Sequence, residues 1–556
     1  MISISSFDVF DTCLVRKCGT PTALFDLLAS EAFTSPVTDD VRHGFILSRL
    51  HADFDNPDPR KNLKTIYSSL SFQHPSLLPI EQLLKKELQL EKDMLSPVQS
   101  TLSLIRNLRE QGHHIIFISD MYLPAAFLHE CLADLGYWID GDSLYVSNEV
   151  GMTKYDGSLY KHIAKKESID YHHWHHYGDN PHSDFSMPTS LGIKSTLLQF
   201  DYSPYQKLWT NNLPELQTRT GQLMAGLSRS VGLSEPPYEQ SNIVLDIIAP
   251  LLVSFVCRIF THASQHGIRH LFFCARDAQA AYFIAQRMER IFPDVKSHYL
   301  YISQQALYEG DETSKMAYYT YIGLASQTET SAIVDIRSTG KSLQYINDLF
   351  KRHNYQPIYG YFLEMFCNGN YISNMPPYHC EIDFLYNRMN GNHFTRSLSA
   401  HWPLLEMFFS PHSDKKTAGY RIVDGIPQPF FAETSDGAEC KIQDIDRVIS
   451  ERKKLLTKYT DTFLILKLDR CADFCFQQIA ISTLAQFFSN PNRQYLKPLT
   501  SFYIRNEYSL KLEPYVEHLS IFSFFRKKKG MAWRKASRIF SIPGWLGKFL
   551  FAETIS

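Results

Sequence analysis

Four short stretches of the sequence combine apolar residues with side chains that could perform chemistry. They are FDVFDT, FISD, GMTKYDG and GDNPHSD. In chain order they supply Asp8 and Thr12, then Ser119, then Lys154, and finally Asp179 and Asp184. Acidic groups at the end of a buried strand are unfavourable for packing, so their presence there indicates a chemical role.

The types of these residues fit one reaction class. A carboxylate such as Asp8 can attack an electrophilic phosphorus atom and form an aspartyl intermediate. A hydroxyl and an ammonium group, such as those of Ser119 and Lys154, can hold the phosphoryl oxygens. Two further carboxylates can hold Mg²⁺, a hard cation that prefers oxygen ligands and brings an anionic nucleophile near an anionic phosphate.

Alternating elements along the first 200 residues would place these side chains together. The patterns predict helices over TLSLIRNLREQG and AAFLHECLADLG and strands over HHIIFIS and SLYVS, which favours βαβ units and a parallel sheet. Ligands of such sheets gather outside the carboxyl ends of the strands, and every candidate lies at such an end. The run HHWHHYGD is predicted to be a strand whose histidines alternate between faces and form no preorganised metal site.

These stretches resemble the haloacid dehalogenase (HAD) superfamily. Its pattern is an apolar strand into Asp-x-x-x-Thr, then an apolar residue and Ser, then Lys, then Gly-Asp-x-x-x-x-Asp, in the order found here. The resemblance implies a Rossmann-like core with a helical cap, a small phosphorylated substrate and Mg²⁺ as cofactor. The roles that it implies are catalysis by Asp8, Ser119 and Lys154, phosphate binding by Thr12, Ser119 and Lys154, and metal binding by Asp8, Asp179 and Asp184.

Position 10 departs from that pattern. The family's phosphatases carry a second aspartate there, which protonates the leaving group, whereas this chain has Phe10. Asp11 lies one residue too late, because neighbouring side chains on an extended segment point in opposite directions. The site could be slow or degenerate, or its substrate could have a good leaving group such as an acyl phosphate or a pyrophosphate. The dehalogenase branch also has a non-acid here and attacks carbon without metal, but Asp179 favours phosphoryl chemistry.

A second group of candidates lies in the other half of the chain. Arg276 and Asp277 follow the apolar run HLFFC, and Asp335 ends the run SAIVDI ahead of a small-residue loop that includes Thr339 and Gly340. Backbone amides at a helix N-terminus bind anions. The loop is similar to the phosphate loop of type I phosphoribosyltransferases, although only one of the usual two acids is present. A phosphosugar or nucleotide site and a plain interaction domain both remain open.

The predicted fold class is α/β, with a Rossmann-like core on a parallel sheet, a helical cap, a second α/β region and a mostly helical C-terminal part. We divide the 556 residues into a core domain (1–19 and 98–204), a helical cap (20–97), a linker (205–242), a second α/β domain (243–440), a helical region (441–524) and a basic aromatic tail (525–556).

The order of segments is similar to that of large bacterial HAD proteins with a long C-terminal extension, which are often associated with surface-polysaccharide synthesis. FDVFDTCLVR, FFCARDAQ, VDIRSTGKSLQ and PLLEMFFSPHSDKKTAGY carry this similarity. It implies phosphoryl hydrolysis or transfer on a small sugar-related metabolite. The alternative is a non-catalytic module that binds a phosphorylated ligand or serves as a scaffold in a glycan-synthesis complex.

The composition limits the partners and the location. A net charge of −2 gives no nucleic-acid footprint, and ten scattered cysteines predict reduced thiols in a cytosolic protein. The longest apolar run, residues 247–257, is too short for a membrane-spanning helix of about 20 residues. We therefore expect a soluble, cytoplasmic protein. Its basic tail would suit contact with the anionic inner face of a membrane, or would form a solvated helix docked by its aromatic residues; the sequence does not give the oligomeric state.

Overall fold

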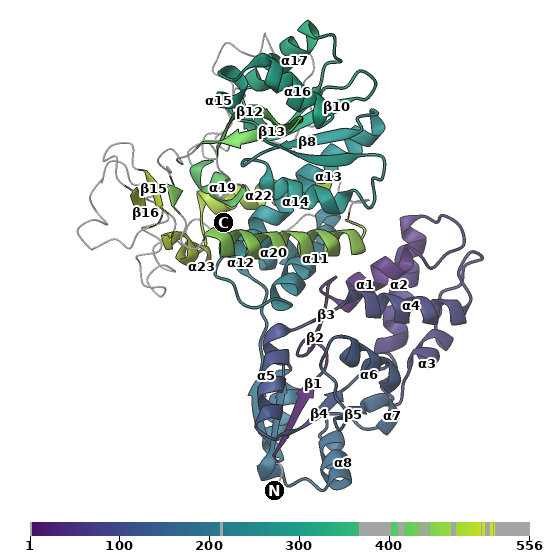
Figure 1. Ribbon diagram of the computed structural model, residues 1–556. Coiled ribbons are helices and arrows are strands. Elements are labelled where there is room, and N and C mark those ends of the chain that lie inside the picture. The colour runs from purple at the N-terminus through teal and green to yellow at the C-terminus, as the bar shows by residue number, and fades with distance from the viewer. Residues whose placement is uncertain are drawn as a thin grey trace. The chain divides into compact units, whose positions relative to one another are not determined.

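The computed structural model describes residues 3–211, 215–365, 402–409, 416–432, 440–441, 445–468, 474–501, 503–505, 512–514 and 516. The chain forms two compact units (Figure 1). One comprises Met1–Pro237 with Thr462–Leu468, and the other comprises Tyr238–Asp461 with Asp469–Ser556. The boundary at Pro237 falls within the segment 205–242 that was predicted to be a linker.

The first unit is built on a five-stranded parallel sheet in the order β5-β4-β1-β6-β7. Its strands are β1 (Ile4–Asp8), β4 (His114–Ser119), β5 (Ser143–Val146), β6 (Trp174–Gly178) and β7 (Lys194–Leu197). Alternate residues of β4 enter two hydrophobic clusters, with Phe117 packed in one and Ile116 and Ile118 in the other. Both faces of the sheet are therefore covered, as parallel sheets require. The covering helices include α5 (Gln99–Glu110), α6 (Ala125–Asp134) and α8 (Ser158–Glu167).

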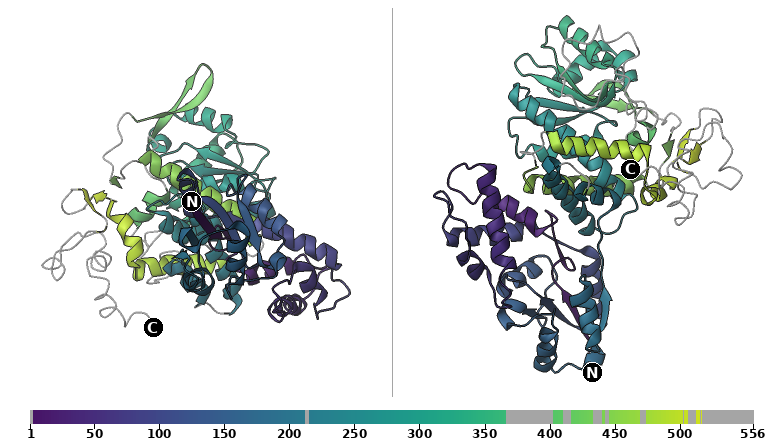
Figure 2. Two further views of the ribbon diagram at one scale, coloured as in Figure 1. Left: turned by 90° about the horizontal axis from the view of Figure 1, so that it is seen from below. Right: turned by 180° about the vertical axis from the view of Figure 1, so that it is seen from behind.

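Four helices form the insert between β2 (Leu14–Arg16) and β3 (Leu95–Pro97), two short strands that pair antiparallel. They are α1 (Pro21–Ala29), α2 (Asp39–Phe54), α3 (Leu63–Ser68) and α4 (Ile80–Met94), and they stand together in both views of Figure 2. The buried face of α4 carries two carboxylates one turn apart, Glu87 and Glu91. Arg49 and Arg16 pair with them in bidentate hydrogen bonds of 2.6–3.0 Å. Such buried pairs hold the insert in one register, because loss of one partner leaves an uncompensated charge.

The predicted linker contains two helices of the first unit, α10 (Pro204–Asn211) and α11 (Glu215–Leu233). Helix α11 packs directly on the chain that follows β2. A Cβ atom built on Gly226 would lie 2.2 Å from the backbone nitrogen of Gly19 and 2.5 Å from the carbonyl carbon of Cys18. Only glycine permits this approach of two backbones.

This contact yields a stability prediction. Gly226→Ala is expected to lower the free energy of unfolding by about 2–3 kcal/mol, because the added methyl group meets backbone that cannot rotate away. Gly44→Ala is a matched helical control, since its Cβ meets only the ring of Phe72, at 3.1 Å, and alanine favours a helix. Urea unfolding of both variants measures the difference. Equal stability of the two would show that α11 does not approach Gly19 as closely as described.

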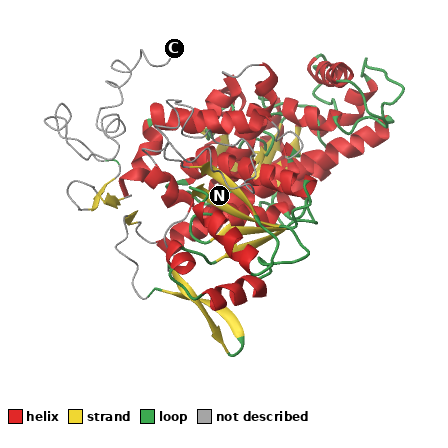
Figure 3. Ribbon diagram, turned by 90° about the horizontal axis from the view of Figure 1, so that it is seen from above, coloured by secondary structure: helices red, strands yellow, loops and turns green. Residues whose placement is uncertain are grey.

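The second unit contains a four-stranded parallel sheet in the order β11-β10-β8-β9. The strands are β8 (His270–Cys274), β9 (Lys296–Leu300), β10 (Ser331–Ser338) and β11 (Tyr359–Met365). Among its helices are α14 (Gln279–Met288), α15 (Gln304–Tyr308), α16 (Glu312–Tyr321), α17 (Lys341–Arg352) and α19 (Trp402–Phe409). A hairpin of β12 (Thr417–Val423) and β13 (Ile426–Phe431) adds a two-stranded ribbon (Figure 3).

The apolar run at residues 247–257 belongs to a longer helical stretch than expected. It comprises α12 (Ser241–Ile243), a π-helical turn (Val244–Ile248) and α13 (Ala249–Gln265). The stretch Ser241–Gln265 is long and apolar enough to cross a membrane, but 94% of its most apolar window is buried inside the chain. A core helix passes the same test of length and composition, so the feature is weak evidence for a membrane span.

The described C-terminal part is mostly helical, with α20 (Ile445–Ile465), α22 (Phe474–Ser489) and α23 (Arg493–Leu496), beside the short strands β14 (Cys440–Lys441), β15 (Tyr503–Arg505) and β16 (Leu512–Pro514). The predicted fold class is thus confirmed: two α/β regions on parallel sheets, followed by a mainly helical part. The predicted basic tail, residues 525–556, lies outside the described residues.

Candidate active site

The carboxyl ends of three neighbouring strands, β4, β1 and β6, deliver the predicted residues to one place. Asp8 is the last residue of β1, and Ser119 is the last residue of β4. Asp179 follows β6, and Asp184 lies in the π-helical turn Pro181–Ser186. Lys154 comes from the loop after the helical turn α7 (Ser147–Val150). The grouping that the sequence predicted is therefore present in the fold.

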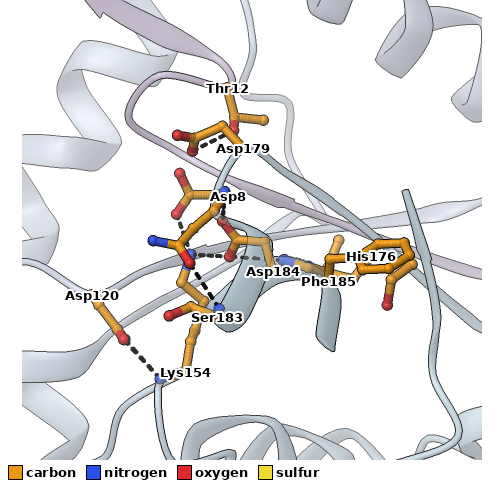
Figure 4. Close-up of polar contacts among 12 residues, drawn as sticks. Asp8, Thr12, Asp120, Lys154, His176, Asp179, Ser183, Asp184 and Phe185 are labelled. Carbon is orange, nitrogen blue, oxygen red and sulfur yellow. Dashed lines mark hydrogen bonds and ion pairs between the residues drawn. The ribbon is translucent and has the colours of Figure 1, made fainter. Parts of the chain in front are cut away.

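A lysine lies at the centre of these carboxylates (Figure 4). Lys154 Nζ donates to Asp8 Oδ1 and, at 2.6 Å, to Asp184 Oδ1. All three residues are less than 8% exposed. One oxygen from each of Asp8, Asp179 and Asp184 lies within 4.8 Å of the others. The site thus brings three carboxyl groups around one lysine, with Asp8, Asp184 and Lys154 buried and Asp179 partly exposed.

Burial and mutual repulsion dominate the electrostatics of the acids. Burial raises the pKa of Asp8 well above its usual value, and the charges of Asp184 and Asp179 add to the effect, so that the attraction of Lys154 is outweighed. Burial, followed by the charges of Asp11 and Asp184, raises the pKa of Asp179 to about 6. The carboxylates repel one another as long as they lack a further cation. This donor set of crowded oxygen ligands fits a hard divalent ion such as Mg²⁺.

The pKa values of Lys154 and Asp184 shift in opposite directions, which keeps the two residues as an ion pair. Burial lowers the pKa of Lys154, but the Asp8 and Asp184 carboxylates outweigh it, so the pKa lies well above the usual lysine value. Burial also disfavours the charge of Asp184, yet Lys154 and a hydrogen bond from His176 hold the pKa of Asp184 far below its usual value. Lys154 therefore stays protonated and Asp184 stays ionised at neutral pH.

Two supporting residues were missed by the sequence analysis. Both oxygens of Asp120 accept the backbone N–H of Lys154 at 2.9 Å, which fixes the loop that carries the lysine. His176, which is fully buried, lies with Nε2 3.2 Å from Asp184 Oδ1 and with Nδ1 2.8 Å from the hydroxyl of Ser6. Because Asp184 only accepts, the Nε2 nitrogen of His176 carries the proton. The acid directly after Ser119 was a usable signal for Asp120, whereas Ser6, which orients the ring of His176, lies 170 residues away in the sequence.

Thr12 contacts one of the three acids. Its side chain is fully buried, and its hydroxyl donates to Asp179 Oδ1 at 3.3 Å. In this arrangement Thr12 orients a predicted metal ligand. Phosphate binding by Thr12 stays a prediction of the sequence.

The loop after β1 does not follow the alternation assumed for an extended segment. Asp11 adopts a left-handed conformation with φ of 53°, so both Phe10 and Asp11 line the cleft. The carboxylate of Asp11 accepts a hydrogen bond from Arg229 of α11 at 3.0 Å. The guanidinium of Arg16 lies over the ring of Phe10, 4.4 Å from its centroid. An aromatic ring under a guanidinium thus occupies the position where an acid was expected.

The cleft above the acids has a volume of about 740 Å³, enough for a small metabolite. Its floor is formed by the residues at the strand ends. Residues of the helical insert complete it, including Phe25, Leu50, Phe54 and Lys61. The second group of predicted residues lies in the second unit and is described below.

Comparisons with known proteins give structural neighbours only. No family model matches the sequence, and no curated protein matches it. Among solved structures, the chain is similar to a HAD phosphatase from Thermococcus onnurineus, with 14% identity over 38% of this chain and 92% of that chain and a TM-score of 0.28. It is also similar to the magnesium-bound putative HAD hydrolase YfnB from Bacillus subtilis, with 16% identity over 36% and 92% and a TM-score of 0.28.

A phosphoserine phosphatase holding an analogue of its phospho-aspartyl intermediate is a third neighbour, with 18% identity over 35% of this chain and 85% of that chain and a TM-score of 0.23. The neighbours thus include a HAD phosphatase, a putative HAD hydrolase and a phosphoserine phosphatase, and 2-haloacid dehalogenases occur among them as well. TM-scores this low carry no conclusion about function.

The raised pKa of Asp179 predicts how proton and Mg²⁺ compete. A carboxyl whose pKa is about 6 when folded and about 4 when unfolded stabilises the cation-free fold at low pH, and this contribution is lost as the pH rises through 6. A divalent cation such as Mg²⁺ would bind the ionised form. Saturating Mg²⁺ is therefore expected to raise the melting temperature by about 3–5 °C at pH 8 and hardly at pH 5. Thermal melts of the parent and of the Asp179→Asn control between pH 5 and pH 8 measure this rise. An equal rise at both pH values would contradict the assignment of Asp179 as a metal ligand.

Proposed function

We propose that the first unit is a HAD-type hydrolase or phosphotransferase that acts through Asp8 on a small phosphorylated substrate with the help of Mg²⁺. The cluster of Asp8, Asp179 and Asp184 around Lys154 carries this proposal. Asp8, Asp179 and Asp184 would hold the ion. When bound, Mg²⁺ supplies positive charge that favours ionised Asp8 and offsets the charge of the phosphate.

The chain's own residues account for the two steps of the reaction. A carboxylate oxygen of Asp8 attacks phosphorus, and the bond between phosphorus and the leaving oxygen breaks with its electron pair on that oxygen. Water, or another acceptor hydroxyl, then attacks the phosphorus of the aspartyl phosphate. The bond between phosphorus and the Asp8 oxygen breaks with its electron pair on that oxygen, which restores the carboxylate, and the proton of the attacking O–H passes to the phosphate product or to solvent. Lys154 and Ser119 lie beside Asp8 and would hold the phosphoryl oxygens.

Phe10 defines the leaving group that this site can serve. Its ring cannot give a proton to the departing oxygen, and loss of a general acid costs about 10²–10⁴-fold in rate for a poor leaving group. A substrate whose leaving group is stable as an anion, such as an acyl phosphate or a phosphoanhydride, avoids that loss. We therefore place the substrate in this class.

The sequence resemblance implies two finer assignments, a sugar-related metabolite and a role in surface-polysaccharide synthesis. The composition of the chain favours two more, a cytoplasmic location and contact of the basic tail with the inner face of a membrane. A cleft of about 740 Å³ would admit a sugar-sized ligand.

Phosphate release from a panel of substrates tests the proposal. Acyl phosphates, nucleoside diphosphates and sugar phosphates would be compared with and without Mg²⁺. We expect Mg²⁺-dependent release, fastest from the acyl phosphate. Binding of the compounds without release from any of them would instead favour a non-catalytic binding or scaffold module.

A further inference from the structure

The sheet of the second unit contains a point where the chain changes direction. Strand β8 leads through α14 to β9 on one side, whereas the adjacent β10 leads through α17 to β11 on the other. Helices α14 and α17 accordingly lie on opposite faces of the sheet (Figure 1). In open parallel sheets such a switch point leaves a crevice outside the carboxyl ends of the strands, which is where ligands bind.

A cavity of about 350 Å³ lies at this switch point. That volume is within the range of small-molecule sites. Its polar lining residues come from the ends of β8 and β10, from the loop into α17 and from the segment after β9; they are Asp277, Ser303, Gln304, Asp335, Arg337, Ser338, Thr339 and Ser342.

Two carboxylates with few partners face this cavity. Asp335 accepts one hydrogen bond among the described residues, from the backbone amide of the adjacent Ile336 at 2.9 Å. Asp277 accepts none from the described part of the chain. Both are partly buried, and burial raises the pKa of each; the charge of Asp277 adds to the effect and raises the pKa of Asp335 to about 8. Carboxyl groups with so few protein partners retain the capacity to accept hydrogen bonds from a ligand.

The same cavity also offers hydrogen-bond donors. Helix α17 has twelve residues and begins after Gly340, which has φ of 78° and provides no side-chain cap. No side chain of a described residue caps the amides of Ser342 and Leu343 in the first turn, and amides at such a position bind anions. The hydroxyls of Ser338, Thr339 and Ser342 stand beside them. One cavity thus offers hydrogen-bond donors for an anionic group and carboxylate acceptors for hydroxyl groups.

We propose that this cavity is a second ligand site, which binds a small phosphate ester with free hydroxyl groups. The phosphate lies at the N-terminus of α17, between Thr339 and Ser342. The hydroxyl groups donate to Asp277 and Asp335. This site does not depend on the function proposed for the first unit.

Two variants of the full-length chain separate the two halves of the site. Ser342→Asp places a negative charge at the second position of α17, where it favours the helix but repels a phosphate. Asp335→Asn keeps the shape of the side chain but replaces one carboxyl oxygen with an NH₂ group, which cannot accept a hydrogen bond. Thr313→Asp, at the same exposed position of α16, is the matched control for an added charge at a helix N-terminus.

The experiment is isothermal titration calorimetry with inorganic phosphate and with ribose 5-phosphate, in EDTA. We expect Ser342→Asp to weaken both probes by at least about tenfold. Asp335→Asn should weaken ribose 5-phosphate by about tenfold and leave inorganic phosphate unchanged. Thr313→Asp should bind both probes like the parent. The site is excluded if neither probe binds the parent, or if folded Ser342→Asp protein binds both as the parent does.

Discussion

Replacing Asp8 with asparagine is expected to abolish Mg²⁺-dependent phosphate release, with a loss of at least about 10³-fold. The amide cannot attack phosphorus, so no aspartyl intermediate forms. Folding should not confound this result. The charged form of Asp8 is disfavoured by burial and by its acidic neighbours, so an uncharged isostere should leave the cation-free fold as stable as the parent, or more stable. Initial rates with the best substrate of the panel, measured beside thermal melts, give both quantities.

Asp170→Asn is the matched control for that variant. Asp170 caps the 3-10 turn before β6 through a hydrogen bond to the backbone N–H of His172, and asparagine caps equally well. It precedes β6, whereas the cleft lies beyond the carboxyl end of that strand, so activity should be unchanged. Residual Mg²⁺-dependent release in Asp8→Asn above a few per cent of the parent rate would show that another group is the nucleophile.

The second large expected effect is a rise in the rate of hydrolysis when Phe10 is replaced. Phe10→Asp supplies the proton donor that this cleft lacks, and we expect hydrolysis of a sugar phosphate to rise by about 10²-fold. An acyl phosphate should gain much less, because its leaving group needs no proton. The ratio of the two rates is therefore the informative quantity. It is measured by phosphate release under single-substrate conditions at neutral pH.

Phe10→Asn separates proton transfer from the change in shape. It removes the ring beneath Arg16 as the aspartate variant does, but it cannot exchange a proton. We expect it to show no gain with either substrate. If Phe10→Asn and Phe10→Asp raised the two rates alike, Phe10 would act through access to the cleft, and the expectation for the leaving group would be withdrawn.

The sequence predicted the sheet and the placement of the acids because both follow from local patterns. Apolar strands that end in Asp8, Ser119 and Gly178–Asp179 are visible residue by residue, and parallel pairing brings such ends together. The alternation of strand and helix likewise predicted the second α/β region. Its acids Asp277 and Asp335 face one cavity for the same reason.

Contacts between segments that are distant in the chain could not be predicted from the sequence. Nothing near Asp11 indicates that Arg229, 218 residues later, would bind its carboxylate. Arg229 belongs to α11, a helix in the segment that was predicted to be a linker. In the sequence, α4 has an ordinary amphipathic pattern. Only the structure shows that Glu87 and Glu91 lie on its buried face, where Arg49 and Arg16 pair with them. The left-handed turn at Asp11 also has no sequence signal of the kind that a glycine gives.

The most direct test of the central claim is to detect the phosphoryl group on Asp8. The parent protein would be mixed with acetyl phosphate and Mg²⁺, quenched in acid within milliseconds to seconds, digested, and examined by mass spectrometry. We predict one phosphoryl group on the peptide that contains Asp8, formed only with Mg²⁺ and absent from Asp8→Asn. A phosphoryl group at another residue, or turnover of substrate without any labelled peptide at the shortest times, would contradict the assignment of Asp8 as the nucleophile.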